Sequence, residues 1–155
     1  MTDELHDSPA RVRLPPQPVI GPVTLHVASG PLIAPVLSRV VSMILARADC
    51  PVDRLDEALI LCDALAAHVP PHSRDGHISF RIDARAGTIE LRVAELGHGG
   101  ASGLIADAEL PDVGNVIEHF SSSRRIEPAA DGTGEELVLD LRFGSASPAD
   151  GRGSA

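Results

Sequence analysis

The stretch Leu59-Ile60-Leu61-Cys62-Asp63-Ala64-Leu65-Ala66-Ala67 forms the centre of a helix that the sequence predicts over residues 53–69. Its apolar residues recur every three or four positions, which is the spacing of a helix with one buried face. The predicted inner stripe consists of Leu55, Leu59, Cys62, Ala66 and Val69. Asp53 is a favourable cap for this helix, and Pro70-Pro71 ends it. An amphipathic helix of this length packs on a second layer, so the segments around it decide the fold.

The segments on either side predict strands and a further helix. Residues 23–27 alternate between apolar and polar side chains, as a half-buried strand does. A helix with Ser29 as its cap follows, and its apolar residues keep the helical spacing. Residues 78–83 and 89–93 alternate again, and a turn at Ala86-Gly87 joins them into an antiparallel hairpin.

The remaining elements complete the predicted fold. A glycine-rich loop follows the hairpin at residues 97–103, and a third helix is predicted at about residues 112–122. Two strands close the chain, one near Ile126 and one at residues 137–143. This order predicts an α+β fold, a two-layer α/β sandwich with a mixed, mostly antiparallel sheet and its helices on one face.

Length and composition indicate one domain with two tails. A chain of 155 residues with 43% hydrophobic content suits a single core. Residues 18–143 carry the periodic apolar pattern and are the predicted domain. Residues 1–17 and 144–155 lack that pattern and are predicted to be disordered tails.

The charge of the chain limits its partners. A net charge of −9 repels nucleic acid and anionic membranes, and it suits a protein partner with a basic face. All 13 basic residues are arginine, which excludes a P-loop lysine and a Schiff-base lysine. No stretch approaches the roughly 18 apolar residues of a membrane span, and the acidic start at residues 1–4 lacks a signal peptide's basic region. These features favour a cytoplasmic location.

The order of helix, hairpin and glycine loop resembles the anti-sigma-factor serine kinases of the GHKL (histidine-kinase-like) ATPase superfamily, over residues 23–143. In that family the helix carries an acid and, four residues later, an asparagine that ligates the magnesium of ATP. Asp63 and Ala67 stand at these two positions. The family's Asp-x-Gly-x-Gly motif looks like Glu95-Leu96-Gly97-His98-Gly99 here, and its later Gly-x-Gly survives only as Gly114.

The resemblance implies a GHKL ATPase-like domain with a candidate nucleotide site. Asp63 is the candidate general base that would take a proton from an attacking serine hydroxyl. The candidate residues for binding ATP with magnesium are Glu95, Gly97, Gly99 and Gly114. Ala67 offers no oxygen to magnesium, and Glu95 is one methylene longer than the family's aspartate. We therefore expect magnesium-ATP to bind weakly or not at all, and we expect no metal site elsewhere.

Three functions remain open from the sequence. The favoured expectation is a regulatory protein that binds a sigma factor or its antagonist in a partner-switching circuit, without enzymatic activity. The first alternative is an active ATP-dependent serine/threonine kinase that phosphorylates an anti-sigma antagonist. The second is a sensor or dimerisation module with no sigma partner. Because members of the family commonly dimerise through the sheet, the resemblance also implies a possible homodimer.

Overall fold

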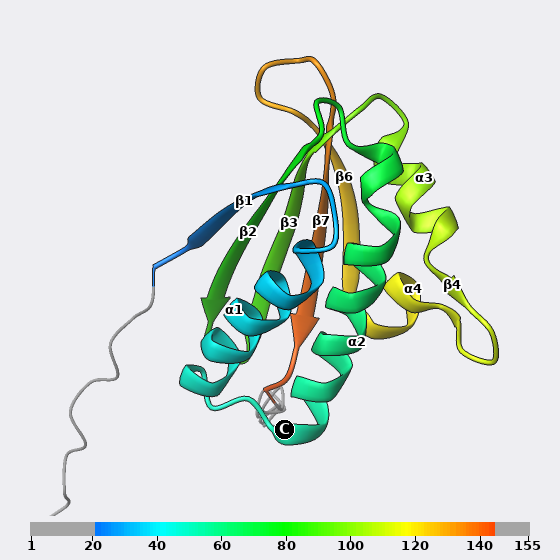
Figure 1. Cartoon of the computed structure of the whole chain (residues 1–155). Coiled ribbons are helices and arrows are strands. Elements are labelled where there is room, and N and C mark those ends of the chain that lie inside the picture. Colours follow the sequence, from blue (N-terminus) through cyan, green and yellow to red (C-terminus); the bar gives the residue numbers. More distant parts are fainter. Residues whose placement is uncertain (1–20, 145–155) are drawn as a thin grey trace, which may run out of the picture.

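The computed structural model describes residues 21–144 (Figure 1). The predicted tail at residues 1–17 lies outside the described residues, and so do residues 145–155 of the other tail. A five-stranded sheet forms one layer of the fold. Its strands, in spatial order, are β1 (Val23–Ala28), β2 (His77–Arg85), β3 (Thr88–Leu96), β7 (Glu135–Arg142) and β6 (Ser123–Pro128).

Helices form the second layer. Figure 1 shows α1 and α2 lying side by side across one face of the sheet, with α3 and α4 beyond α2. The helical segments are α1 (Ile33–Arg47), α2 (Val52–His68), the 3-10 helix η1 (Pro70–His72), α3 (Gly100–Asp107) and α4 (Val116–Phe120). A two-stranded ribbon of β4 (Glu109–Leu110) and β5 (Gly114–Asn115) links α3 to α4. The predicted α+β class with a mostly antiparallel sheet is confirmed.

The strand pairings differ from the prediction in one respect. Every pairing between neighbouring strands of the described sheet is antiparallel, so the mixed component that we expected is absent from these residues. The hairpin of β2 and β3 turns at Ala86-Gly87, where Gly87 has a φ of 73°. A glycine is favoured there because this left-handed conformation crowds any Cβ.

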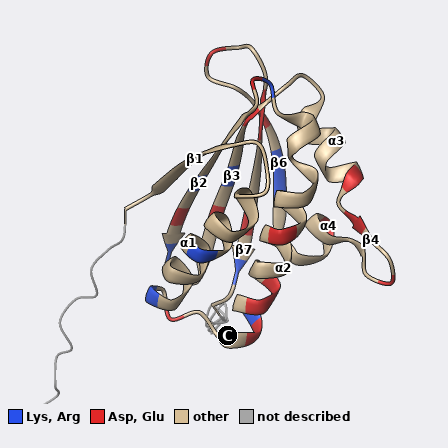
Figure 2. Ribbon diagram, in the orientation of Figure 1, with Lys and Arg blue, Asp and Glu red and all other residues tan. Residues whose placement is uncertain are grey.

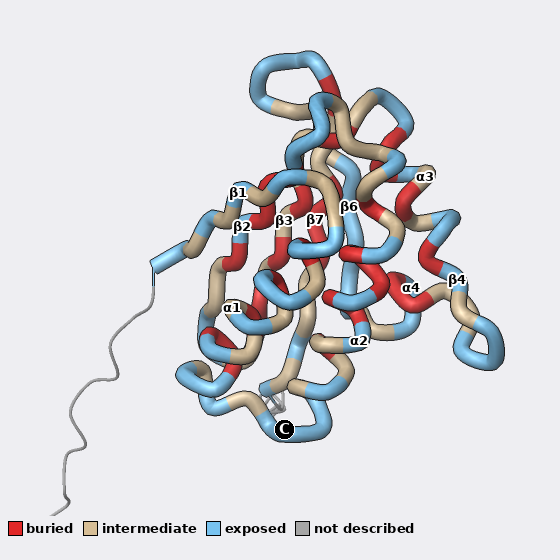
Figure 3. The backbone as a smooth tube through the Cα atoms, in the orientation of Figure 1, coloured by how far each residue is buried: buried red, intermediate tan, exposed pale blue. Residues whose placement is uncertain are grey.

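The core lies between the helices and the sheet, where Figure 3 shows the buried residues gathered. Leu37 of α1, Leu61 and Leu65 of α2 and Phe80 of β2 are fully buried. Cys62, Ala66 and Val69 of the predicted α2 stripe are also buried, whereas Leu59 is only half-buried. The buried face of α2 is therefore centred on Leu61 and Leu65, and Asp63 and Ala67 are exposed.

Two helix starts differ from the prediction. Helix α1 begins at Ile33 rather than after Ser29, because the Ser29 N–H donates to Gly76 O and so continues the pairing of β1. Pro35 fits in the first turn of α1, where a backbone N–H has no intrahelical acceptor. Helix α2 begins directly after Pro51, which places Asp53 in its first turn instead of at its cap.

The region after β3 differs more. The predicted third helix at residues 112–122 is reduced to α4, because Asp112 and Gly114 have positive φ values of 66° and 80° and break the helical path. Asn115 caps α4 by accepting the Glu118 N–H at 3.1 Å. The stretch that we expected to be a glycine loop is helical from Gly100 onward and forms α3.

Candidate functional site

The glycine stretch after β3 forms a tight entry into α3. Gly99 is the residue before the helix and has a φ of 73°. The backbone donors near it are already bonded within the protein. The Gly97 N–H donates to His72 O at 3.0 Å, and the Gly100 N–H donates to Gly97 O at 2.9 Å. A phosphate cradle needs free N–H groups, so these two donors are not available to a nucleotide.

A carboxylate of the protein itself also contacts the N-terminus of α3. The Ala101 N–H donates to Oε2 of Glu135, from strand β7, at 3.3 Å. The start of a helix attracts negative charge because its N–H groups lack acceptors and its dipole is positive there. Glu135 therefore supplies negative charge at the N-terminus of α3.

His72 fills the space between the end of α2 and the glycine stretch. Its Nε2 lies 2.7 Å from Oδ2 of Asp107, at the far end of α3. A Cβ built on Gly103 would lie 2.5 Å from the His72 ring atom Cε1, and one on Gly100 would lie 3.1 Å from His72 O. Close packing of η1 against α3 thus accounts for both glycines without a ligand.

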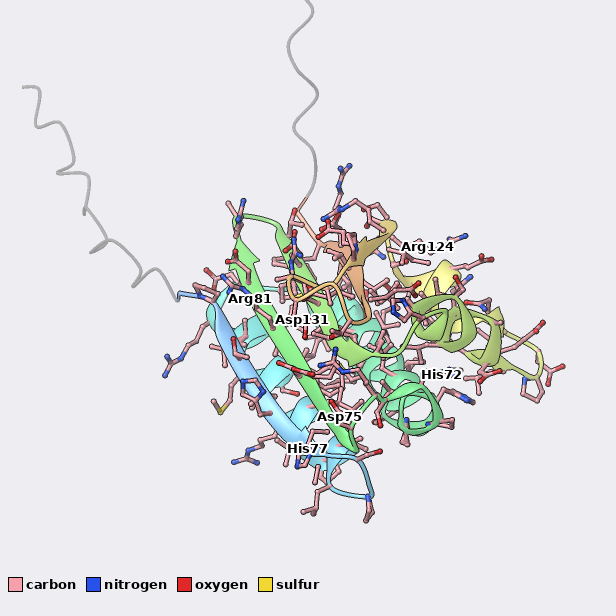
Figure 4. The ribbon with its side chains drawn as sticks, turned by 90° about the horizontal axis from the view of Figure 1, so that it is seen from above. His72, Asp75, His77, Arg81, Arg124 and Asp131 are labelled. Carbon is pink, nitrogen blue, oxygen red and sulfur yellow. The ribbon has the colours of Figure 1, made fainter. Side chains whose placement is uncertain are left out.

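Glu95 is held by an arginine. It has a φ of 67° at the irregular end of β3, where the pairing with β7 shifts register. Its Oε2 lies 3.2 Å from Nη2 of Arg74, and Nη1 of Arg74 lies 3.2 Å from Oδ2 of Asp131. Asp75 makes a third contact with Arg74 at 3.0 Å, and Figure 4 looks down on this end of the molecule with Asp75 and Asp131 labelled. Arg74 therefore engages Glu95 through one of its two carboxylate oxygens.

The same cluster shifts the pKa values of two of its members, Arg74 and Asp131. The hydrogen bond that Arg74 donates to Asp75, together with the charges of Asp131 and Asp75, raises the pKa of the Arg74 guanidinium above its ordinary value. Hydrogen bonds from Thr133, with Arg74 nearby, lower the pKa of Asp131. A cavity of about 220 Å³ lies beside the cluster, lined in part by Arg74, Glu95 and Asp131. It is smaller than the roughly 300–1,000 Å³ of common ligand pockets.

Asp63 stands apart from these residues. It is exposed on α2, where its Oδ1 accepts a hydrogen bond from Ser38 of α1 at 3.3 Å. Within residues 21–144, no hydrogen bond or ion pair links Asp63 to Glu95 or to the glycine stretch. A general base has to reach the proton that it abstracts, and the candidate phosphate position is not within the contacts of Asp63.

Gly114 lies at the other end of α3. Val116, two residues later, donates its N–H to Ala108 O at 2.8 Å, directly after the last residue of α3. Gly97 and Gly99 precede Gly100, the first residue of that helix, and a helix of 8 residues spans about 12 Å. The structure brings Glu95, Gly97 and Gly99 together by chain continuity, and it joins neither Asp63 nor Gly114 to them.

Sequence reasoning did not find the residues that occupy this site. They come from η1, the segment between η1 and β2, the end of α3, the loop between β6 and β7, and β7, and in that order they are His72, Arg74, Asp107, Asp131 and Glu135. Arg74 and Asp131 are separated by 57 residues, and no short motif joins them. The sequence indicates only the close packing at Gly100 and Gly103, because a glycine is present at both positions.

Three further findings bear on function. Among the described residues, no group of three or more histidine, cysteine, aspartate or glutamate side chains is arranged to hold a metal ion. Within the same residues, the helices are all too short or too polar to cross a membrane. Compared with known proteins, the chain matches no family model and no curated protein. A function for this chain therefore has to be argued from its own geometry.

Proposed function

We propose that this chain is a regulatory protein-binding domain of the anti-sigma type, which binds a sigma factor or its antagonist without using ATP. The observation that carries the proposal is that side chains of the protein itself contact the start of α3, where the resemblance would put a nucleotide. Glu135 bonds to the N-terminus of α3, and His72 packs on the glycine stretch that would otherwise approach a phosphate. In this proposal the surface of the protein, and not a bound nucleotide, carries the function.

The charge distribution supports a basic partner. On the open face of the sheet, arginines and carboxylates pair with each other, for example Arg92 with Glu90 at 2.7 Å and Arg125 with Asp140 at 2.9 Å. The acidic excess therefore falls on the helical side, as Figure 2 shows for α2 and for the region from α3 to α4. The exposed acidic residues there are Asp49, Asp53, Asp56, Asp63, Asp107, Glu109, Asp112 and Glu118. DNA-contacting regions of sigma factors are basic, so this face would complement them.

The first test asks whether ATP binds. A Kd of about 10 μM at about 1 mM magnesium-ATP would stabilise the fold by about 2.7 kcal/mol. That would raise the melting temperature by several degrees in a domain of this size. We expect no shift in differential scanning fluorimetry and no heat in titration calorimetry. A shift of several degrees would favour the kinase alternative, and phosphate transfer to an antagonist-like protein would establish it.

The second test measures the binding of candidate partner proteins. Sigma factors and antagonist-like proteins are titrated against the full chain from low to high salt, because screening at physiological ionic strength acts within about 8 Å. We expect binding at micromolar concentration that weakens with salt. The double variant D56N/D63N should weaken binding, whereas D83N, on the open sheet face beside Arg85, should not. Failure of every such protein to bind in low salt would leave the sensor or dimerisation module as the better function.

A further inference from the structure

Strand β1 is an edge strand with unpaired backbone groups. One side of β1 pairs with β2, and the other side is the edge of the sheet. At the end of the ladder with β2, the Ser29 N–H donates to Gly76 O at 2.8 Å. Hydrogen-bonded pairs alternate along an antiparallel ladder, so Val27, Leu25 and Val23 bond to β2. The N–H and C=O groups of the intervening residues point to the free edge. These residues are Thr24, His26 and Ala28.

The two edges of the sheet differ in their protection. Strand β6, the opposite edge, carries Arg124, Arg125 and Pro128, which are residues that discourage a further strand from pairing. Strand β1 reads Val-Thr-Leu-His-Val-Ala and contains no charged residue, no proline and no bulge. An uncharged, regular edge of six residues is a template for another strand.

An apolar flank of α1 borders this edge. Leu32, Val36 and Met43 are 65%, 37% and 53% exposed. They recur at helical spacing on one side of α1, and Ser38, which bonds to Asp63 of α2, lies on another side. The flank therefore faces away from α2 and toward the β1 side of the sheet, where Figure 1 shows α1. A strand added to β1 would place every second side chain against these three residues.

The charges around the edge are positive and lack acidic partners. Among the described residues, no carboxylate lies within ion-pair distance of Arg39, Arg47 or Arg81, whereas Arg74, Arg92 and Arg125 each pair with several. Arg39 and Arg47 follow Leu32 and Val36 at helical spacing along α1. Arg81 is paired in register with Thr24, and Figure 4 labels it on β2 beside β1. This corner is thus basic in a chain of net charge −9.

We infer that β1 accepts an extended segment of a partner protein as a sixth strand of the sheet, and that this segment alternates apolar with acidic residues. Its backbone would bond to Thr24, His26 and Ala28, and its apolar side chains would cover the flank of α1. Its carboxylates would then point to the open face of the sheet, the face on which Arg81 of β2 lies. This surface is separate from the acidic helical face of the proposed function, so either can fail without the other.

The binding test uses a synthetic eight-residue peptide in which valine and glutamate alternate, labelled for fluorescence polarisation. The full-length protein should bind it with a Kd on the order of 100 μM, as weak strand-addition contacts allow. A peptide in which lysine replaces glutamate should bind at least about tenfold more weakly, because its charge matches that of the arginines. Equal binding of both peptides, or none at millimolar concentration, overturns the inference.

Matched variants locate the site. H26P removes one outward N–H without removing a bond to β2, and proline is tolerated at such edge positions. We expect it to weaken the peptide about tenfold, whereas H26A, which keeps the N–H, should change binding less than about twofold. R81E should likewise abolish the preference for glutamate, and R124E on the opposite edge should not. An effect of R124E equal to that of R81E would mean that net charge alone drives binding.

Amide hydrogen exchange gives a readout independent of the variants. The amides of Thr24, His26 and Ala28 should exchange quickly in the free protein and slowly with the glutamate peptide, while those of Leu25 and Val27 stay slow throughout. Slow exchange of all five amides in the free full-length protein would mean that the edge is already covered, by residues 1–20 or by a second copy. That outcome would also overturn the inference.

Discussion

Replacing Gly103 by alanine tests whether the glycine stretch serves packing or a ligand. Gly103 lies inside α3, where alanine is favoured over glycine by about 1 kcal/mol. A Cβ there would lie 2.5 Å from Cε1 and 2.8 Å from Nδ1 of His72, both too close for real atoms. The imidazole therefore has to move by about 1 Å to reach ordinary contact distance. All the nearby atoms belong to the His72 ring, so H72A removes the clash completely.

The expected effect of G103A changes sign with the residue at position 72. Moving His72 loses its 2.7 Å contact with Asp107, which is about 1 kcal/mol for a hydrogen bond. Overpacking adds about 1–3 kcal/mol, and the helix preference for alanine offsets about 1 kcal/mol. G103A should thus destabilise the wild-type protein by about 1–3 kcal/mol. In the H72A background the same change should stabilise by about 1 kcal/mol, a coupling of about 2–4 kcal/mol.

Urea unfolding, followed by far-ultraviolet circular dichroism, measures the free energy of unfolding of the wild type, G103A, H72A and the double variant. The dependence of this free energy on urea concentration has to be the same in all four proteins for the comparison to hold. G132A is the control, because Gly132 has a φ of 72° and no atom near a built Cβ. It should destabilise both backgrounds equally, by about 1 kcal/mol. If G103A stabilises the wild type as much as it stabilises the H72A variant, the packing of His72 does not explain why residue 103 is a glycine.

Three more predictions follow from the described residues. Hydrogen bonds from Arg92 lower the pKa of Glu127, and hydrogen bonds from Ser123 and Arg125 lower the pKa of Asp140 although its burial acts the other way. Because these pKa values are depressed, unfolding titrations should show stability lost as the pH falls below about 4.5, and R125Q should reduce that loss. Burial raises the pKa of the Cys62 thiol to about 12, so a thiol reagent at neutral pH should modify Cys50 alone in the native protein and both cysteines in urea. Trimming residues 1–17 and 145–155 should leave the melting temperature unchanged, while trimming into Gly144 should lower it, because Gly144 donates its N–H to Gly87 O.

The parts of the fold that follow from local rules were predictable. The hairpin of β2 and β3 depends on alternation and on the turn at Ala86-Gly87, which all lie within 20 consecutive residues. The end of α2 depends on Pro70-Pro71 alone. In both cases the interactions that decide the structure are between residues close in the chain, so the local sequence is sufficient to predict them.

The parts that failed depend on contacts between distant residues. Glycines at 99, 100 and 103 indicate a loop by propensity, yet the packing of His72 makes Gly100–Asp107 a helix. Arg74 contacts Glu95, and Glu135 contacts the N-terminus of α3. Each of these contacts joins residues more than 20 positions apart in the chain. The resemblance supplied candidate positions for a nucleotide, but it carried no information on whether other side chains occupy them.

The contact of Glu135 with α3 bears on whether ATP could regulate the proposed protein binding. A carboxylate fixed on β7 competes for the N–H groups of α3 at an effective concentration of at least about 1 mM. ATP at about 1 mM would have to displace it with no asparagine at position 67 to help hold magnesium, and it would also have to separate Glu95 from Arg74. We therefore expect ATP to have little effect on the conformation of this region. The occupancy of the acidic helical face would then depend on the concentrations and affinities of competing protein partners, so adding nucleotide to the salt-dependent binding assay should leave every measured affinity unchanged.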